Sequence, residues 1–70
     1  MESTYKIVEL VGSSPESWEK AAKVALGEAR QTLRDLRIAE VEQLDIHLDE
    51  EGEIVAYRTK LKVSFKYQGN

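Results

Sequence analysis

The fold is decided by the stretch of residues 55–67, which reads VAYRTKLKVSFKY. Apolar or β-branched side chains alternate with charged or small ones along its whole length, and a period of two predicts a β-strand. One face carries Val55, Tyr57, Thr59, Leu61, Val63, Phe65 and Tyr67. Arginine, lysine and serine occupy the other face, so we expect a long strand with one buried face and one wet, cationic face.

The stretch before it, residues 37–48, is predicted to be a less regular strand. Its apolar side chains fall at odd positions in the first half (Ala39 and Val41) and at even positions in the second half. The alternation of apolar and polar residues therefore shifts by one position near Glu42 and Gln43. A one-residue slip moves side chains to the other face of a sheet, and a β-bulge is the usual way to absorb it.

A turn around Glu50 and Glu51 is expected to join these two strands into an antiparallel hairpin. The predicted register sets Ile46 opposite Val55 and Leu44 opposite Tyr57, with all four side chains on the core face. The same register puts Asp45 and His47 on the wet face, near the cationic row.

The N-terminal half predicts a strand over residues 4–11 and then a helix over residues 15–35. Ser14 before Pro15 is typical of a helix N-cap followed by proline in the first turn. An apolar stripe at spacings of three and four follows, formed by Trp18, Ala21, Ala22, Ala25, Ala29, Leu33 and Leu36. This stripe is flat, so the helix is expected to approach the sheet closely, with Trp18 packing under the sheet edge. Gly27, unfavourable inside a helix, is expected to mark a close backbone approach.

The order strand, helix, strand, strand predicts a two-layer α+β fold of type β-α-β-β, with a three-stranded antiparallel sheet packed on one helix. The 70 residues form a single domain, 1–70. A chain this short buries little surface alone and usually relies on disulfides, a metal or partner subunits. The sequence has no cysteine and one histidine, so self-association is the expected supplement.

Composition excludes several classes of function. A net charge of -3 and a pI of about 5.1 argue against a nucleic-acid-binding protein. No apolar run is long enough to span a bilayer, and the first residues lack the pattern of a signal peptide. We therefore expect a cytoplasmic protein. No catalytic triad, carboxylate pair or glycine-rich phosphate loop is present, which predicts that the chain is not an enzyme and has no catalytic residues.

Several stretches in this order resemble the dodecin family over nearly the whole chain. They are Tyr5–Gly12, Ser13–Trp18, Ala29–Leu36, Ala39–Val41 and Tyr57–Phe65. The resemblance implies a hollow homododecamer that holds flavins such as riboflavin or FMN in pairs between subunits. It also implies a role in flavin storage and protection, without turnover.

The flavin-binding positions that the resemblance implies are altered. In the family a tryptophan that stacks on the flavin stands directly before Ala39-Glu40-Val41, where this chain has Ile38. A glutamine that hydrogen-bonds the flavin follows the position of Tyr57, where this chain has Arg58. The sequence resembles a branch that lacks the stacking tryptophan and binds calcium. For Ile38 the alternative is an apolar interface residue; for Arg58 it is a cross-strand ion pair with Asp45, or a phosphate or carboxylate contact.

Candidate calcium ligands are Glu16, Asp45 and Asp49, the last two belonging to an acidic cluster that continues through Glu50, Glu51 and Glu53. Calcium prefers several oxygen ligands, but the cluster lacks the alternating spacing of a calcium loop. A solvated turn, and a helix-start charge at Glu16, are the simpler interpretations.

Three functional hypotheses follow. The first is a non-catalytic shell protein that binds or sequesters a small ligand or a cation such as calcium, with a degenerate flavin site. The second is a store for FMN or riboflavin whose contacts have shifted. The third is a structural oligomer without a ligand.

Overall fold

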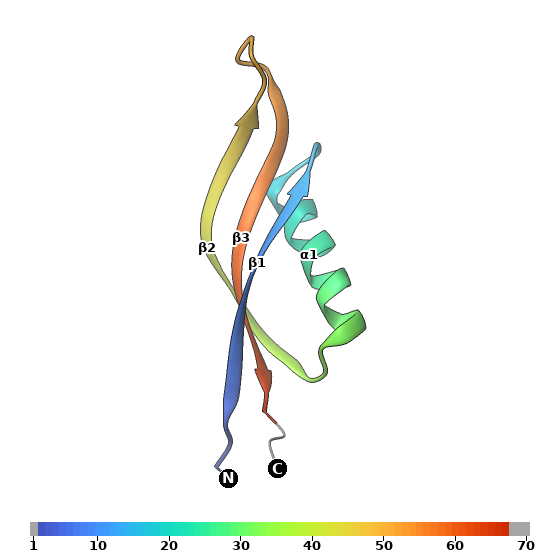
Figure 1. Ribbon diagram of the computed structural model, residues 1–70, viewed down its shortest axis with the longest axis vertical. Coiled ribbons are helices and arrows are strands. Elements are labelled where there is room, and N and C mark those ends of the chain that lie inside the picture. The colour runs from blue at the N-terminus through green and yellow to red at the C-terminus, as the bar shows by residue number, and fades with distance from the viewer. Residues whose placement is uncertain (1, 68–70) are drawn as a thin grey trace.

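Residues 2–67 are described by the computed structural model, so Met1 and residues 68–70 of the predicted domain lie outside it. The elements are β1 (Tyr5–Ser14), α1 (Trp18–Thr32), β2 (Leu36–Leu48) and β3 (Ile54–Lys66). The strands form one antiparallel sheet in the order β1-β3-β2, and α1 packs on one face of it (Figure 1). The predicted α+β fold is confirmed. The molecule is elongated, with extents of 52 × 20 × 17 Å.

The hairpin between β2 and β3 has a longer turn than the sequence predicted. Ile46 pairs with Tyr57 and Leu44 with Thr59, so the predicted register was wrong by two residues. The reason lies in Asp49, whose carboxylate accepts hydrogen bonds from the backbone amides of Glu51 and Glu53, both at 2.9 Å. This side-chain capping stabilises a loop of residues 49–53 instead of a two-residue turn. A shift by two leaves each side chain on its predicted face.

The predicted bulge in β2 is present, since the pairing with β3 shifts between Val41 and Gln43. A second shift lies between Leu36 and Ile38 at the start of the strand. Just before it, Asp35 adopts a left-handed backbone conformation with φ 60°. The chain therefore enters β2 through an irregular segment that the hydrophobic pattern did not indicate.

Helix α1 is shorter than predicted at both ends. Its N-cap is Ser17, whose hydroxyl accepts a hydrogen bond from the Lys20 amide at 3.0 Å. The predicted cap, Ser14, is instead the last residue of β1, and its buried hydroxyl accepts from the Glu16 amide at 3.0 Å. Both serines can cap, but Ser17 lies one turn before the amide that it binds, which is the geometry of a true N-cap.

The close approach between helix and sheet occurs at Gly12 and not at Gly27. A Cβ atom at Gly12 would lie 1.9 Å from the carbonyl oxygen of Ala21 and 3.0 Å from the Cβ of Ala25. At Gly27 a Cβ atom would meet nothing within 4 Å, so the prediction for Gly27 was wrong. The sheet supplies the glycine because the helix already presents alanines at the contact.

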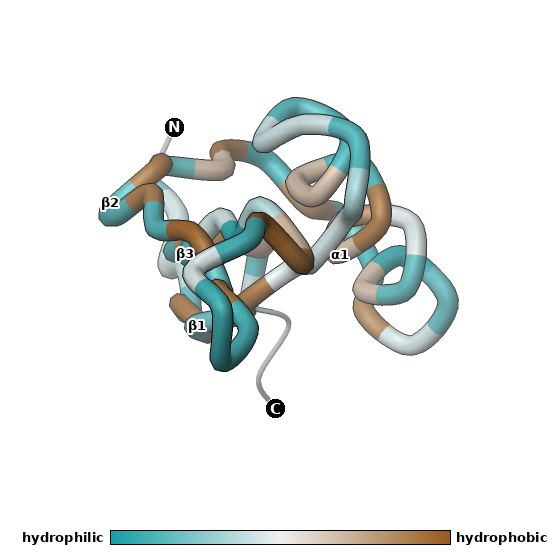
Figure 2. Tube along the Cα trace, turned by 90° about the horizontal axis from the view of Figure 1, so that it is seen from above, coloured by the Kyte–Doolittle hydropathy of each residue, from teal (hydrophilic) through white to brown (hydrophobic). Residues whose placement is uncertain are grey.

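The core is small and lies between α1 and the two strands β1 and β3. The helix contributes Ala21, Ala25 and Ala29, which are buried, and the sheet contributes Leu61 and Val63, each 1% exposed. Hydrophobic and hydrophilic residues alternate along the strands in Figure 2, as expected for a sheet with two different faces. No helix in residues 2–67 is long and apolar enough to cross a membrane.

Candidate ligand and cation sites

The face of the sheet that points away from α1, called here the outer face, carries the cationic row of β3. Three ion pairs join this row to the neighbouring strands: Arg58–Asp45 at 2.7 Å, Lys62–Glu42 at 3.0 Å and Lys60–Glu9 at 3.7 Å. Carboxylates from both flanking strands therefore largely neutralise the face that the sequence marked as cationic. A hydrogen bond from Lys62 to Glu42 raises the pKa of the lysine.

Arg58 is held by Asp45 in a two-point contact. Its Nε and Nη2 atoms donate to the two carboxylate oxygens at 2.7 and 2.9 Å. These hydrogen bonds lower the pKa of Asp45 and raise that of Arg58. The cross-strand ion pair considered for Arg58 is therefore present, and its guanidinium has a partner before any ligand binds. Such planar two-point pairing is the geometry that arginine favours.

Ile38 lies elsewhere on the same face. It pairs with Ser64 of the neighbouring strand β3, and its side chain is 68% exposed. Ser64 and Arg58 are six positions apart in β3, which corresponds to about 20 Å along a strand. Within one chain, the two positions implied by the family resemblance are therefore not brought together, and a ligand touching both would need more than one subunit.

A shallow hollow surrounds Ile38. One part of it, about 450 Å³, is lined by Tyr5, Arg37, Ile38 and Ser64. A smaller part of about 130 Å³ continues past Ile38 and Ser64 to Ile7, Glu40 and Lys62. We call these seven residues the outer-face hollow. Ile7, Ile38 and Tyr5 form its apolar lining, and Arg37, Glu40 and Lys62 form its charged lining. Ile38 stands where the family resemblance implies a stacking tryptophan.

The three candidate calcium ligands lie apart and have partners within the chain. Asp45 binds Arg58, Asp49 caps the hairpin loop, and Glu16 lies 3.7 Å from Lys20. Among residues 2–67, no three histidine, aspartate or glutamate side chains gather in a way that could hold a metal ion. A calcium site built from these residues would need carboxylates from several subunits.

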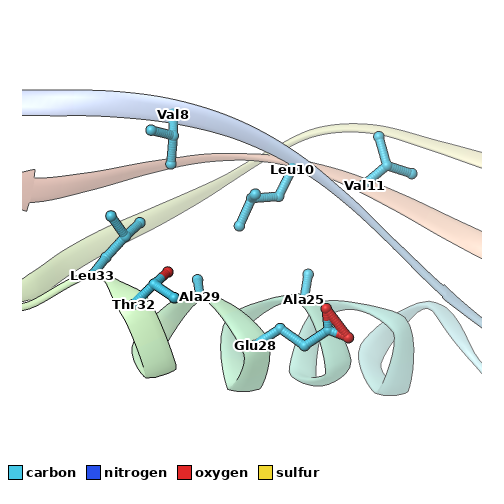
Figure 3. A pocket seen from close by; sticks show the side chains of 8 residues that line it. All are labelled: Val8, Leu10, Val11, Ala25, Glu28, Ala29, Thr32 and Leu33. Carbon is cyan, nitrogen blue, oxygen red and sulfur yellow. The ribbon is translucent and has the colours of Figure 1, made fainter.

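A second hollow, of about 300 Å³, lies between α1 and the edge strand β1 (Figure 3). Val8 and Leu10 point from the strand toward the helix, and Ala25 and Ala29 face them from α1. The sequence did not predict this hollow, although the alanine stripe of α1 is a signal for it. Small side chains on the helix leave space that the strand does not fill.

Trp18 lies at the edge strand β2, in line with the predicted packing under the sheet edge, and it also ties the start of α1 to the hairpin. Its indole Nε1 donates to the carbonyl oxygen of Asp45 at 3.0 Å, and its ring meets that of Tyr57 edge to face at 5.1 Å. The Thr59 hydroxyl donates to the Trp18 carbonyl at 2.8 Å. These contacts connect the Arg58–Asp45 pair on the outer face to the helix on the other side of the sheet.

Comparison with known proteins identifies the family to which the chain belongs. The dodecin family model matches residues 4–68. The chain belongs to the dodecin family. It is 47% identical over 64 residues to the calcium dodecin of Mycobacterium tuberculosis, covering 91% of this chain and 89% of that protein. It is 41% identical over 68 residues to the dodecin of Thermus thermophilus, covering 97% of both.

Solved dodecin structures share the fold. The crystal structure of the Mycobacterium tuberculosis calcium dodecin, described as having a novel calcium-binding site, superposes with a TM-score of 0.85 at 44% identity, covering 97% of this chain and 96% of that one. The dodecin of Streptomyces coelicolor superposes with a TM-score of 0.90 at 32% identity, covering 97% and 96%. Dodecins are non-catalytic small binding proteins, which confirms the prediction that the chain is not an enzyme. Family membership also implies a homo-oligomer that binds a small ligand.

Proposed function

We propose that this dodecin assembles into a hollow shell of twelve copies that binds or sequesters a small ligand or cation, calcium first, in the seams between subunits. The observation that carries the proposal is the apolar surface of a single copy. Among residues 2–67, six apolar residues are buried, whereas twelve large apolar ones are at least 39% exposed. The exposed set is Tyr5, Ile7, Val11, Val24, Ile38, Val41, Leu44, Ile46, Leu48, Ile54, Val55 and Tyr67.

Exposed apolar surface on this scale is the mark of a protein–protein interface. Val41, Leu44 and Ile46 lie on the helix-side face of β2 and stay exposed. The helix packs mainly on β1 and β3 and meets β2 near Trp18. Burying such side chains is favourable by about 25 cal/mol for each Å² removed from water. Other copies of the chain supply that burial in a closed shell.

Calcium is the favoured cation because the chain is similar to a protein named calcium dodecin over nearly its whole length. The carboxylates of one copy are engaged or dispersed, so the proposed site draws oxygen ligands from neighbouring copies. Glu16, Asp45 and Asp49 remain the candidate ligands. The cysteine-free sequence fits the reducing cytoplasm, where we place the protein.

Flavin storage is the second candidate, and a shell without a ligand is the third. The outer-face hollow favours some small ligand at the flavin-equivalent position. Ile38 offers no ring, however, and stacking on an aromatic side chain contributes about 0.5–1.5 kcal/mol beyond area burial. Arg58 is also committed to Asp45. Both features weaken the flavin interpretation relative to the cation.

The assembly is tested by light scattering after size-exclusion chromatography. A mass near twelve times 8.0 kDa is expected. A stable, folded species of 8.0 kDa would refute the shell.

The ligand is tested by thermal unfolding with added CaCl₂, with MgCl₂ as the control, and then with a chelator. Calcium binding to the folded state raises the melting temperature, and the chelator reverses the gain. Quenching of FMN fluorescence in a parallel titration, without any calcium effect, would favour flavin storage. A shell that responds to neither would support the structural oligomer.

A further inference from the structure

The hollow between α1 and β1, called here the helix-side hollow, has an apolar interior. Val8 and Leu10 face it from the strand, and Ala25 and Ala29, which are 8% and 7% exposed, form its base on the helix (Figure 3). Leu33 lines one end, directly after the last residue of α1. Replacing the water over such walls with an apolar group is favourable.

The helix-side hollow is short, which limits what it can hold. Ala25 and Ala29 are four positions apart on a helix, or about 6 Å along its axis. Val8 and Leu10 are two positions apart on a strand, or about 7 Å. The volume of the hollow is about 300 Å³. A cyclohexyl ring or a short branched chain matches these dimensions, whereas a long acyl chain does not.

Covering the exposed apolar residues with other copies of the chain does not require closing the helix-side hollow. Val8, Leu10 and Leu33 are not members of that exposed set. Val11, which is a member, directly follows Leu10 in β1, so its side chain points away from α1 (Figure 3). A copy that covers Val11 therefore packs on the outer face, on the other side of the sheet.

The rim of the helix-side hollow carries a carboxylate without a counter-ion. Among the described residues that line the hollow, Glu28 is the only charged one. Within residues 2–67 its carboxylate has no ion-pair or hydrogen-bond partner. Thr32 lies one turn further along α1, and side chains four positions apart are neighbours on a helix surface. A carboxylate and a hydroxyl oxygen beside an apolar hollow can both accept hydrogen bonds from an ammonium group.

From this geometry we infer that the helix-side hollow binds a compact aliphatic ammonium ion. The hydrocarbon part lies against Val8, Leu10 and Ala29. The ammonium group donates to the Glu28 carboxylate and to the Thr32 hydroxyl. Glu28 selects the charge of the ligand, because it attracts a cation and repels an anion. The site lies within one copy of the chain, so it is separate from the seams between copies that the proposed function uses.

The test is a titration of the assembled protein with cyclohexylamine, followed by ligand-observed saturation-transfer NMR at about pH 7, where such an amine is protonated as lysine is. The wild type should bind cyclohexylamine about threefold more tightly than the neutral analogue cyclohexanol, a factor in the range of an exposed ion pair. Glu28→Gln should remove this preference and leave cyclohexanol binding unchanged. Glu19→Gln, which removes a carboxylate from the first turn of α1 outside the hollow, is the matched control and should keep the preference.

The apolar part of the site is tested by filling it. Ala29→Leu extends a branched side chain into the hollow and should weaken the binding of both probes several-fold. Light scattering and circular dichroism on each variant show whether assembly and fold are retained. A readout that needs no substitution is the methyl NMR spectrum of the wild type, in which the signals of Val8, Leu10 and Leu33 should shift on addition of cyclohexylamine.

Three results would overturn the inference. They are the absence of cyclohexylamine binding to the wild type at millimolar concentration, equal losses in Glu28→Gln and Glu19→Gln, and methyl shifts that leave the signals of the helix-side hollow unmoved. The mass of the assembly and its response to calcium are measured on the same samples. Both are independent of this hollow, so failure of the amine site would leave the proposed function standing.

Discussion

Replacing Gly12 by alanine tests the contact on which the two-layer packing depends. The new Cβ would lie 1.9 Å from the carbonyl oxygen of Ala21 and 2.8 Å from its carbonyl carbon. Both atoms belong to the backbone of α1, so no side-chain rotation relieves the overlap, and the helix must move away from β1 by more than 1 Å. Overpacking of a core costs about 1–3 kcal/mol, and occasionally more. We expect Gly12→Ala to lie at the upper end, at about 3 kcal/mol.

For a domain of this size, about 3 kcal/mol corresponds to a fall of the melting temperature on the order of 12–24 °C. The assay is thermal unfolding followed by circular dichroism at one fixed subunit concentration, because the stability of an oligomer depends on concentration. Gly27→Ala is the matched control. Its Cβ meets nothing within 4 Å, and alanine is favoured over glycine inside a helix by about 1 kcal/mol. The reasoning is refuted if Gly12→Ala melts with the wild type, or if both variants lose stability equally.

Three other perturbations test the outer face and the assembly. Asp45→Asn should make the free energy of unfolding less dependent on pH in the acid range. Because the pKa of Asp45 is lowered in the folded state, its ion pair stabilises the fold above the ordinary aspartate pKa of about 3.9. This stabilisation is lost as the pH falls through the lower pKa of the folded state. A stability difference between wild type and variant that does not shrink between about pH 5 and pH 2 would contradict this. Ile38→Trp combined with Arg58→Gln should create or strengthen FMN affinity, measured by fluorescence quenching, and unchanged FMN binding would count against the placement of the flavin-equivalent site. Leu44→Glu should lower the mass of the assembly in light scattering, whereas Gln43→Glu on the opposite face should not. If the two variants have equal masses, β2 is not part of the subunit interface.

The fold could be predicted largely because its patterns are long. Thirteen residues of period two identify β3, and seven apolar residues at helical spacing identify α1. The slip near Gln43 was visible because the apolar side chains of β2 change from odd to even positions there. Such signals average over many residues, so a single unusual side chain does not hide them.

The details that failed depend on single hydrogen bonds. Asp49 captures two backbone amides and lengthens the hairpin loop, which moves the register by two residues. Ser17 takes the cap that Ser14 was expected to form. Ser14 pairs with Tyr57 as the last residue of β1, which leaves Ser17 to cap the helix.

The candidate sites were the least predictable part. The pairing of Arg58 with Asp45 was among the alternatives because both residues fall on one face of adjacent strands. The hollow around Ile38 was not foreseen, since it depends on a bulge at Leu36 that turns Arg37 toward the isoleucine. Periodicity is broken at a bulge, so the pattern carries no information about where the extra side chain points.

The central place of β3 in the sheet constrains how the chain folds. Both β1 and β2 pair with β3. The partner of β1 therefore begins forty residues after the last residue of β1. The hairpin of β2 and β3 closes a short loop and can form early, whereas joining β1 requires ordering the intervening helix. Contacts so distant in sequence slow the search for the native state. During synthesis β1 is made long before β3, so the apolar side chains of β1 need protection from aggregation until β3 has been synthesised.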